Sequence, residues 1–420
     1  MPSYQKPTGT LDILPEEQRY WYYVRDQARH LAELAGFERI DLPIFEDTSL
    51  FARGVGEGTD IVDKEMYSFT DKGDHDITLR PEFTAGMVRA YIENGMQVLP
   101  EPVKLYTFGP IFRYERPQAG RYRQHTQFDV EIIGEQHPSA DLEVMLLAWD
   151  LYARLGFRDL SFQLHSTGCP KCKPDYVAEL VDYYEDHLTV ICEDCVRRLE
   201  RSPLRVLDCK KEQCQPVIEE APHFLDHLCE ECAEHFDTLR SYLDLLGREY
   251  TINHRLVRGL DYYTKTVFEV WAAGIGAQSA VCGGGRYDGL TEELGGPPTP
   301  GVGFGSGLER IIMVLQDLEI DVPPLPRPSV FLAHLGKAAE RKSLELTEEL
   351  RKADVGAWFA FGDRGLRSQL READKREVRY TVILGENELE AGVATVREMR
   401  EGDQVEVPLV DLVNWLKERV

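Results

Sequence analysis

Apolar and polar positions along the first third of the chain follow two different periods. Over 16–36 the apolar residues recur at helical spacing and the segment ends at Gly36, which predicts a helix. A second helix is expected over 84–95. The segments 103–116 and 123–134 read as strands and flank a Pro/Gly turn, so they predict a long antiparallel hairpin.

Two further regions of different character follow. Strands are expected at 266–272 and 278–282, followed by a glycine-rich turn, and a glycine-dense strand leading into an apolar helix is expected over 301–318. After the Pro-rich segment 321–328, strands and helices alternate regularly to the end of the sequence. Such alternation predicts a separate small α/β domain behind a semi-rigid linker.

The segment 169–236 is rich in cysteine and acidic residues and looks helical between its cysteine pairs, so we expect an insertion between two halves of one sheet. Two CxxC-like pairs supply four thiolates to one tetrahedral metal, and structural zinc is therefore the favoured interpretation. Reduced thiols without a ligand, or a redox or iron–sulfur role, are the alternatives. Cys282 stands alone and is expected to pack. The candidate metal ligands are Cys169, Cys172, Cys192, Cys195, Cys209, Cys214, Cys229 and Cys232.

Composition narrows the class of protein. The 420 residues are 43% hydrophobic and 29% charged, which is ordinary for a soluble globular protein of two or three domains. No apolar run approaches the ~18 residues of a membrane span, and no signal peptide is visible, so we expect a cytoplasmic protein without a membrane partner. The net charge of −25 argues against a protein that coats DNA or RNA non-specifically, although local basic patches would still permit specific RNA binding.

An arginine cluster stands out against this acidic background. Arg113, Arg116, Arg121 and Arg123 surround the predicted hairpin turn with a single acidic residue, Glu115, among them. Guanidinium groups are multidentate donors to phosphate, although a solvated hairpin tip is the plain alternative. The sequence has neither GxxxxGK[ST] nor GxGxxG, so any bound ATP must be held by another device.

Other polar residues gather near predicted element ends. Gln127 and Glu131 lie four apart on the returning strand and therefore share a face, where buried polar groups need partners. Glu82 and Thr84 precede a helix, and capping is the plain alternative for Thr84.

A second group of polar residues accompanies the glycine-rich segments. Arg258, Tyr262 and Tyr263 follow one another closely around Gly259 and suit a small polar ligand, and Arg310 lies in the first turns of a helix after a glycine-dense strand.

Five segments in this order resemble the histidyl-tRNA synthetases, a family of class II aminoacyl-tRNA synthetases. The resemblance covers nearly the whole chain and is weakest in the cysteine-rich insertion. Pro43 matches the motif 1 proline at that family's dimer interface, which implies a homodimer. The segments are TLRPEFT (78–84), FRYERPQAGRYRQ (112–124), LVRGLDYYTKTVFE (256–269), GGGRYDGL (283–290) and GVGFGSGLER (301–310).

The resemblance implies an α+β fold: a class II antiparallel sheet flanked by helices, a mostly helical cysteine-rich insertion and a C-terminal α/β anticodon-binding domain. The implied domains are a catalytic domain over 1–168 and 249–321, an insertion over 169–248, a linker over 322–327 and the anticodon-binding domain over 328–420. In the last of these, a helix over 364–376 carries a basic stripe that faces either the anticodon stem or solvent.

The resemblance also implies a reaction, in which histidine and ATP with Mg²⁺ form histidyl-adenylate and the 3′-terminal ribose of tRNA(His) then takes the histidine. Arg113 would hold the α-phosphate and Arg310 the γ-phosphate, while Arg258 would neutralise charge that develops on the α-phosphate. Arg121 and Arg123 would also meet ATP. Arg116 and Gln118 would meet the acceptor end of the tRNA.

Six residues would form the pocket for L-histidine. Glu82, Thr84 and Gln127 would position its amino group, and Glu131 and Tyr263 would bracket the imidazole with Tyr262 alongside. Buried polar partners suit this ring because an analogue without its nitrogens leaves them unpaired.

The chain also departs from the family's pattern next to this pocket. Phe83 stands where Gly is frequent, and His125–Thr126 stands where Phe-His is common. A catalytically silent, histidine-sensing regulatory paralogue is the alternative function, although such proteins generally lack the anticodon-binding domain and lose motif residues. A zinc-ribbon RNA-binding module fused to an inert domain is a second alternative.

Overall fold

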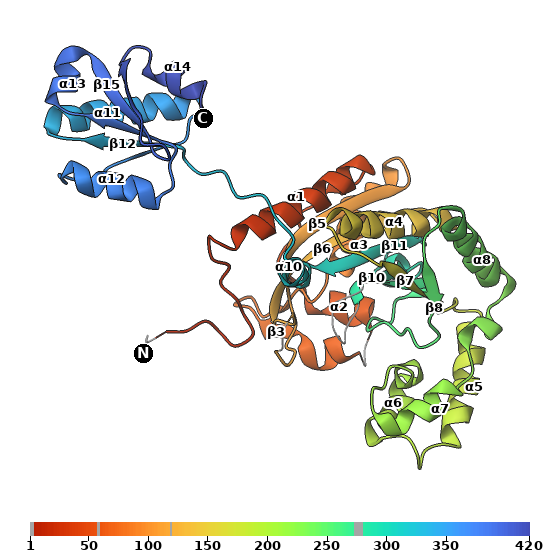
Figure 1. The fold of residues 1–420 in the computed structure, drawn as a ribbon. Helices are drawn as coiled ribbons and strands as arrows, with labels where there is room; N and C mark the ends of the chain where they lie inside the picture. Colours follow the sequence, from red (N-terminus) through yellow and green to blue (C-terminus); the bar gives the residue numbers. More distant parts are fainter. Residues whose placement is uncertain (1–3, 57–58, 118–119, 273–279) are drawn as a thin grey trace. The chain divides into compact units, whose positions relative to one another are not determined.

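The computed structural model describes residues 4–56, 59–117, 120–272 and 280–420 (Figure 1). The chain divides into two compact units, Met1–Pro323 and Pro324–Val420. Each unit has its own sheet and its own apolar core. Within the described ranges, no helix is long and apolar enough to cross a membrane.

An eight-stranded sheet forms the centre of the first unit, and its six inner strands pair antiparallel with one another. The two edge strands, β1 and β8, pair in parallel with β5 and β7. The expected antiparallel sheet flanked by helices is therefore confirmed. In spatial order the strands are β1 (Glu38–Arg39), β5 (Val103–Phe112), β6 (Gln124–Ile133), β11 (Gly301–Gly307), β10 (Ala280–Arg286), β9 (Thr264–Trp271), β7 (Ser161–Ser166) and β8 (Tyr250–Ile252).

The two faces of this sheet differ because side chains alternate along each strand. On β6, Phe128, Val130 and Ile132 are fully buried in the main apolar core. The helices that cover this face are α1 (Gln18–Leu34), α4 (Pro138–Arg154) and α10 (Leu308–Asp317). The intervening residues of β6 are polar and point to the opposite face, which carries the candidate site.

Smaller elements frame that opposite face. Helix α3 (Thr84–Glu93) packs there with α9 (Leu290–Glu293) and α2 (Thr48–Val55). A three-stranded sheet, β2 (Phe45–Asp47), β4 (Asp76–Leu79) and β3 (Tyr67–Thr70), lies beside them. One turn of π-helix, η1 (Ile61–Glu65), and a short 3₁₀ turn, η2 (Met96–Val98), complete the region.

The cysteine-rich insertion leaves the sheet after β7 and returns at β8, as expected from the sequence. It consists of helices and 3₁₀ turns with its own small core, in which seven of the cysteines are buried. The elements are α5 (Lys173–Glu185), α6 (Glu193–Arg201), η3 (Pro203–Val206), η4 (Glu212–Cys214), α7 (Gln215–Glu219), η5 (Phe224–His227) and α8 (Glu230–Leu245).

The second unit is the small α/β domain that the strand–helix alternation predicts. Its sheet has three parallel strands, with β12 between β13 and β14, and continues antiparallel through β15 and β16. Its elements are β12 (Val330–His334), α11 (Lys337–Lys352), β13 (Ala357–Phe359), α12 (Leu366–Lys375), β14 (Tyr380–Leu384), α13 (Glu386–Ala391), β15 (Val393–Glu398), β16 (Gln404–Pro408) and α14 (Leu412–Lys417).

One sequence expectation is wrong: the three glycines 283–285 belong to strand β10 and do not form a turn. Glycine is required at these positions because atoms of the neighbouring strands lie where a Cβ atom would be. A Cβ atom on Gly285 would lie 2.6 Å from the backbone oxygen of Thr266, and one on Gly284 would overlap the backbone oxygen of Gly303. Glycine inside a strand marks such close approach as well as turns.

Candidate active site

A cavity of about 920 Å³ lies on the polar face of the large sheet. It gathers most of the residues predicted to bind histidine, ATP or tRNA, although they come from separate parts of the sequence. The predicted residues that line it are Glu82, Thr84, Arg113, Arg121, Gln127, Glu131, Arg258, Tyr262, Tyr263 and Arg310.

Buried carboxylates form one group in this cavity. Glu131 is 1% exposed and accepts hydrogen bonds of 2.6 Å from the hydroxyls of Thr84 and Tyr287. Burial raises the pKa of Glu131 to about 8. Burial likewise raises the pKa of Glu82, whose carboxylate accepts the backbone N–H groups of Thr84 and Ala85 at the start of α3. Glu82, and not the Thr84 side chain, therefore caps this helix.

Asp129 belongs to the same group and was not predicted. It lies between Gln127 and Glu131 on the same face of β6, and its Oδ1 accepts a 3.2 Å hydrogen bond from the Gln127 amide. Burial, together with the charges of Glu131 and Glu82, raises its pKa well above the ordinary value. Its buried Oδ2 has no hydrogen-bond partner within the part of the chain described. The alternation of side chains between the two faces of β6 is the sequence signal that could have identified Asp129.

Three tyrosines lie beside these carboxylates. The rings of Tyr262 and Tyr263 are 4.8 Å apart, and that of Tyr287 is 5.8 Å from Tyr262. Burial raises the pKa of all three hydroxyls, which therefore stay protonated as hydrogen-bond donors. Tyr287 also escaped the sequence analysis, although it belongs to the GGGRYDGL segment. Carboxylates and hydroxyls together suit a small cationic ligand with ring N–H groups.

Arginines form a second group. Arg258 Nη1 donates to Glu269 at 2.5 Å, and Arg113 Nε donates to the backbone oxygen of Pro81 at 2.8 Å. Arg121 and Arg310 line the same cavity, and burial together with the charge of Arg121 lowers the pKa of Arg310. Cationic groups held together in this way favour an anion such as a polyphosphate.

Of the three residues that depart from the family pattern, only His125 lines the cavity, whereas Thr126 and Phe83 do not. His125 lines the cavity, and burial and then the charge of Arg113 lower its pKa to about 4, so it is neutral near pH 7. Thr126 donates its backbone N–H to Glu309 at 2.8 Å. The Phe83 ring is 1% exposed and packs in the apolar core beneath α3, with the Arg80 guanidinium over it at 4.3 Å.

The remaining hairpin residues lie outside this cavity. The Arg123 guanidinium lies 3.8 Å from the Tyr114 ring centroid, and its Nε donates to the backbone oxygen of Glu115 at 3.2 Å. Arg116 lines an adjoining cavity of about 600 Å³. Gln118 is outside the described residues.

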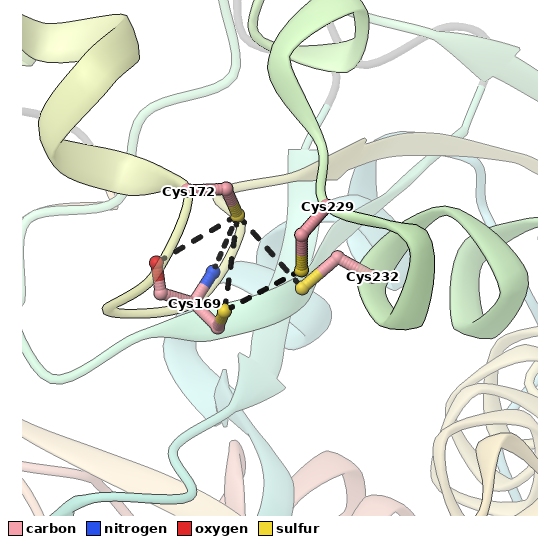
Figure 2. A group of neighbouring side chains, drawn as sticks. All are labelled: Cys169, Cys172, Cys229 and Cys232. Carbon is pink, nitrogen blue, oxygen red and sulfur yellow. Dashed lines mark hydrogen bonds between the residues drawn. The ribbon is translucent and has the colours of Figure 1, made fainter.

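The cysteines form two separate groups of four, in each of which the sulfur atoms all lie within 4.8 Å of one another. The neck cluster consists of Cys169, Cys172, Cys229 and Cys232, and Figure 2 shows its four sulfur atoms turned toward one another. The distal cluster consists of Cys192, Cys195, Cys209 and Cys214. The first pair thus joins the fourth and the second pair joins the third, which the spacing left open.

Comparisons with known proteins agree over both units. Residues 9–311 match a family model described as Histidyl-tRNA synthetase, and residues 329–419 match one described as Anticodon binding domain. A histidine–tRNA ligase of Dehalococcoides mccartyi is 51% identical over 417 residues, which cover 99% of this chain and 100% of the relative.

Solved structures give the same picture. The apo histidyl-tRNA synthetase of S. aureus superposes with a TM-score of 0.83 at 37% identity, over 99% of this chain and 100% of that one. A Bacillus halodurans structure titled ATP phosphoribosyltransferase regulatory subunit/histidyl-tRNA synthetase has a TM-score of 0.62 at 19% identity, over 91% of this chain and 98% of that one. That second likeness concerns the fold alone. The family model covers most of the chain, and a relative is about half identical over nearly its full length. The chain therefore belongs to the histidyl-tRNA synthetases, a family of class II aminoacyl-tRNA synthetases.

Proposed function

We propose that this chain is a histidine–tRNA ligase that makes histidyl-adenylate from L-histidine and ATP with Mg²⁺, and then esterifies tRNA(His). One observation carries the proposal: a group of buried carboxylates and tyrosines and a group of arginines line a single cavity. An amino acid and a nucleotide polyphosphate have the charges that these two groups complement. The regulatory alternative is disfavoured by the matched anticodon-binding domain and by the curated relatives, which are named as ligases.

Histidine binds at the carboxylate and tyrosine group. Glu82, Gln127 and Thr84 position the ammonium group, while Glu131 accepts a ring N–H and Tyr263, with Tyr262 beside it, contacts the other side of the ring. Asp129, whose second oxygen lacks a partner among the described residues, supplies further negative charge beneath the ammonium. Because these groups are desolvated, a ligand without the matching donors leaves them unpaired, which gives selectivity.

ATP binds along the arginine group. Arg113 holds the α-phosphate and Arg310 the γ-phosphate, with Arg121 close to Arg310. As the histidine carboxylate attacks the α-phosphorus and pyrophosphate leaves, negative charge grows on the α-phosphate oxygens. Arg258, held by Glu269, neutralises that charge from a fixed position, which lowers the barrier without reorganisation of the solvent. Arg123, on the same hairpin loop, also contacts the nucleotide.

The adjoining cavity and the second unit meet the tRNA. Arg116 and Gln118, on the hairpin loop, contact the acceptor end. On α12, Arg367, Arg371 and Lys375 are exposed and available for the anticodon stem, whereas Arg364 precedes the helix and forms an ion pair with Glu372.

The enzyme acts as a homodimer in the cytoplasm. Pro43 lies in a strip that also exposes Ile44 and Phe45, and exposed apolar side chains in a row are typical of an interface. The insertion binds structural zinc, because each cysteine group offers four sulfur ligands to one ion.

The direct test is aminoacylation of tRNA(His) with labelled histidine by the full chain. Arg113→Ala should retain histidine binding and lose most of the activity, whereas Lys352→Ala, an exposed substitution in the second unit, serves as a matched control and should behave like the parent protein. Absence of histidine esterification by the parent protein would refute the proposal.

A further inference from the structure

The distal cysteine cluster shares its chain segment with the wall of the catalytic cavity. Asp208 and Lys210, which line the cavity, stand on either side of Cys209, and Gln215, which also lines it, directly follows Cys214. Cys209 and Cys214 are buried, while Asp208 and Lys210 are exposed. The segment is therefore anchored by its sulfur atoms and presents its polar side chains to the cavity.

Side-chain contacts fix the position of this wall, among them the 2.8 Å ion pair between Lys211 and Asp194 and the buried side chain of Leu207. Residues 207–211 have no helix or strand, so no backbone ladder defines their path. The Gln215 side chain donates to the backbone oxygen of Cys209 at 2.7 Å and accepts from Arg255 Nη2 at 2.5 Å. Arg255 stands three residues before Arg258, so the wall is tied to the segment that carries the catalytic arginine.

The sulfur geometry of the distal cluster fits a single tetrahedral ion. A Zn–S bond of about 2.3 Å gives tetrahedral S–S edges of about 3.8 Å. The Cys192–Cys209 and Cys195–Cys214 sulfur distances are both 3.9 Å. Backbone N–H groups of Cys192 and Lys211 donate to the Cys214 and Cys209 sulfurs, which favours thiolates over thiols.

The neck cluster has the same sulfur geometry in a different place. Its Cys169–Cys172 and Cys169–Cys229 sulfur distances are 3.8 Å. It joins the start of α5 to the start of α8, the first and last helices of the insertion (Figure 2). Glu231, between two of its ligands, pairs with Lys265 at 3.1 Å. None of the described residues next to these four cysteines lines the catalytic cavity.

We infer that the insertion binds two zinc ions independently, and that the distal ion builds the part of the catalytic wall that contacts the nucleotide substrate, while the neck ion only fastens the insertion. This inference rests on the proposed ligase function for its kinetic part. Lys210 lines the cavity, pairs with Asp208 at 2.8 Å in the ligand-free chain, and supplies a cation for a phosphate of the bound nucleotide. Each site forms when four thiols release their protons to solvent and the thiolates take the metal, with no change of oxidation state.

The first test counts metal in the purified full chain by inductively coupled plasma mass spectrometry. The parent protein should hold two zinc ions per chain, and Cys195→Ser and Cys172→Ser should each hold one. Iron with the visible absorption of a sulfide cluster, no metal at all, or loss of both ions through one substitution would overturn the inference. These counts do not depend on catalysis.

The second test measures KM for ATP in histidine-dependent pyrophosphate exchange. Cys195→Ser should raise it by about five-fold or more, which corresponds to one lost substrate hydrogen bond, and Cys172→Ser should leave it within about two-fold. Lys210→Ala keeps both ions and should reproduce the rise, so it remains informative where Cys195→Ser does not fold. An unchanged KM in Lys210→Ala would overturn the wall's role. A parent protein that lacks exchange altogether would instead refute the proposed function and leave the zinc counts standing.

Discussion

Arg258 donates from Nη1 to Oε1 of Glu269 at 2.5 Å, while the indole N–H of Trp271 donates to the other oxygen of the same carboxylate at 3.0 Å. Glu269 and Trp271 point to the same side of β9 because they are two residues apart. The carboxylate is thus fixed by the strand and in turn orients the guanidinium group in the cavity. Glu269 is accordingly a positioning residue for Arg258.

Glu269→Gln should lower kcat for pyrophosphate exchange by about 10-fold to 100-fold, because a mispositioned catalytic group costs that much. KM for histidine should stay close to the parent value, since Glu269 is not part of the proposed histidine contacts. Glu269→Asp should recover part of the rate by restoring the charge. Equal kcat in the parent protein and Glu269→Gln would contradict this role.

Gly283 makes room for the same arginine. A Cβ atom there would lie 2.6 Å from the guanidinium carbon of Arg258, which is the far end of a flexible side chain. Gly283→Ala should therefore fold with little change in melting temperature but lose about 100-fold in exchange rate, since Arg258 must move. Gly365→Ala, where nothing lies within 4 Å of the added carbon, is the matched control. The idea fails if Gly283→Ala exchanges pyrophosphate as fast as that control.

Glu131 makes the stability of the ligand-free protein depend on pH. Its pKa is about 8 in the folded protein and about 4.5 ordinarily, because burial disfavours the charged form. Its ionisation therefore costs folding free energy that grows as pH rises from about 4.5 to about 8 and then levels off.

Glu131→Gln should consequently gain stability relative to the parent protein, on the order of 3 kcal/mol, between about pH 5 and pH 8.5. Urea unfolding at the two pH values measures the difference. A free-energy difference between variant and parent that is the same at both would show that Glu131 does not titrate in this range.

A buried ion pair joins helix α4 to strand β10 of the central sheet. Arg286 and Asp141 are both 0% exposed, and Arg286 Nε donates to the Asp141 carboxylate at 3.1 Å. His235 lies 3.3 Å from the same carboxylate. Although burial opposes ionisation, the charge of Arg286 holds the pKa of Asp141 at about 2.

Asp141→Asn should lower the free energy of unfolding by about 3–5 kcal/mol, because it removes the fully buried counter-charge of Arg286 and leaves this guanidinium only its pair with the partly exposed Asp288. Glu143→Gln on the same helix removes the half-exposed pair with Lys104 and should cost less than about 1 kcal/mol. Chemical denaturation compares the two variants, and similar losses in both would argue against a special role for the buried pair.

The sequence predicted those site residues whose signal is local. Strand alternation placed Gln127 and Glu131 on one face, and the same rule would have added Asp129 between them. The arginines at Arg113 and Arg258 stood out because they lie in motifs. Their assigned roles stay predictions until they are tested.

The remaining features depend on contacts between distant segments, which no local pattern encodes. The glycines 283–285 suggested a turn, but their cause is the approach of β9, β11 and Arg258 from elsewhere in the fold. Glu269 ends the same LVRGLDYYTKTVFE segment that contains Arg258, but their pairing depends on how the chain folds back between them, which the spacing does not show. The cysteine grouping required the path of the insertion, which brings its first and last pairs together at the neck.

The central claim, activation of histidine, is tested most directly by ATP–pyrophosphate exchange on the purified full chain with each of the twenty amino acids in turn. The account predicts exchange with histidine alone, and a loss of most of that rate, about 100-fold to 1000-fold, in Arg258→Ala. Exchange with a different amino acid, or with none, would contradict it.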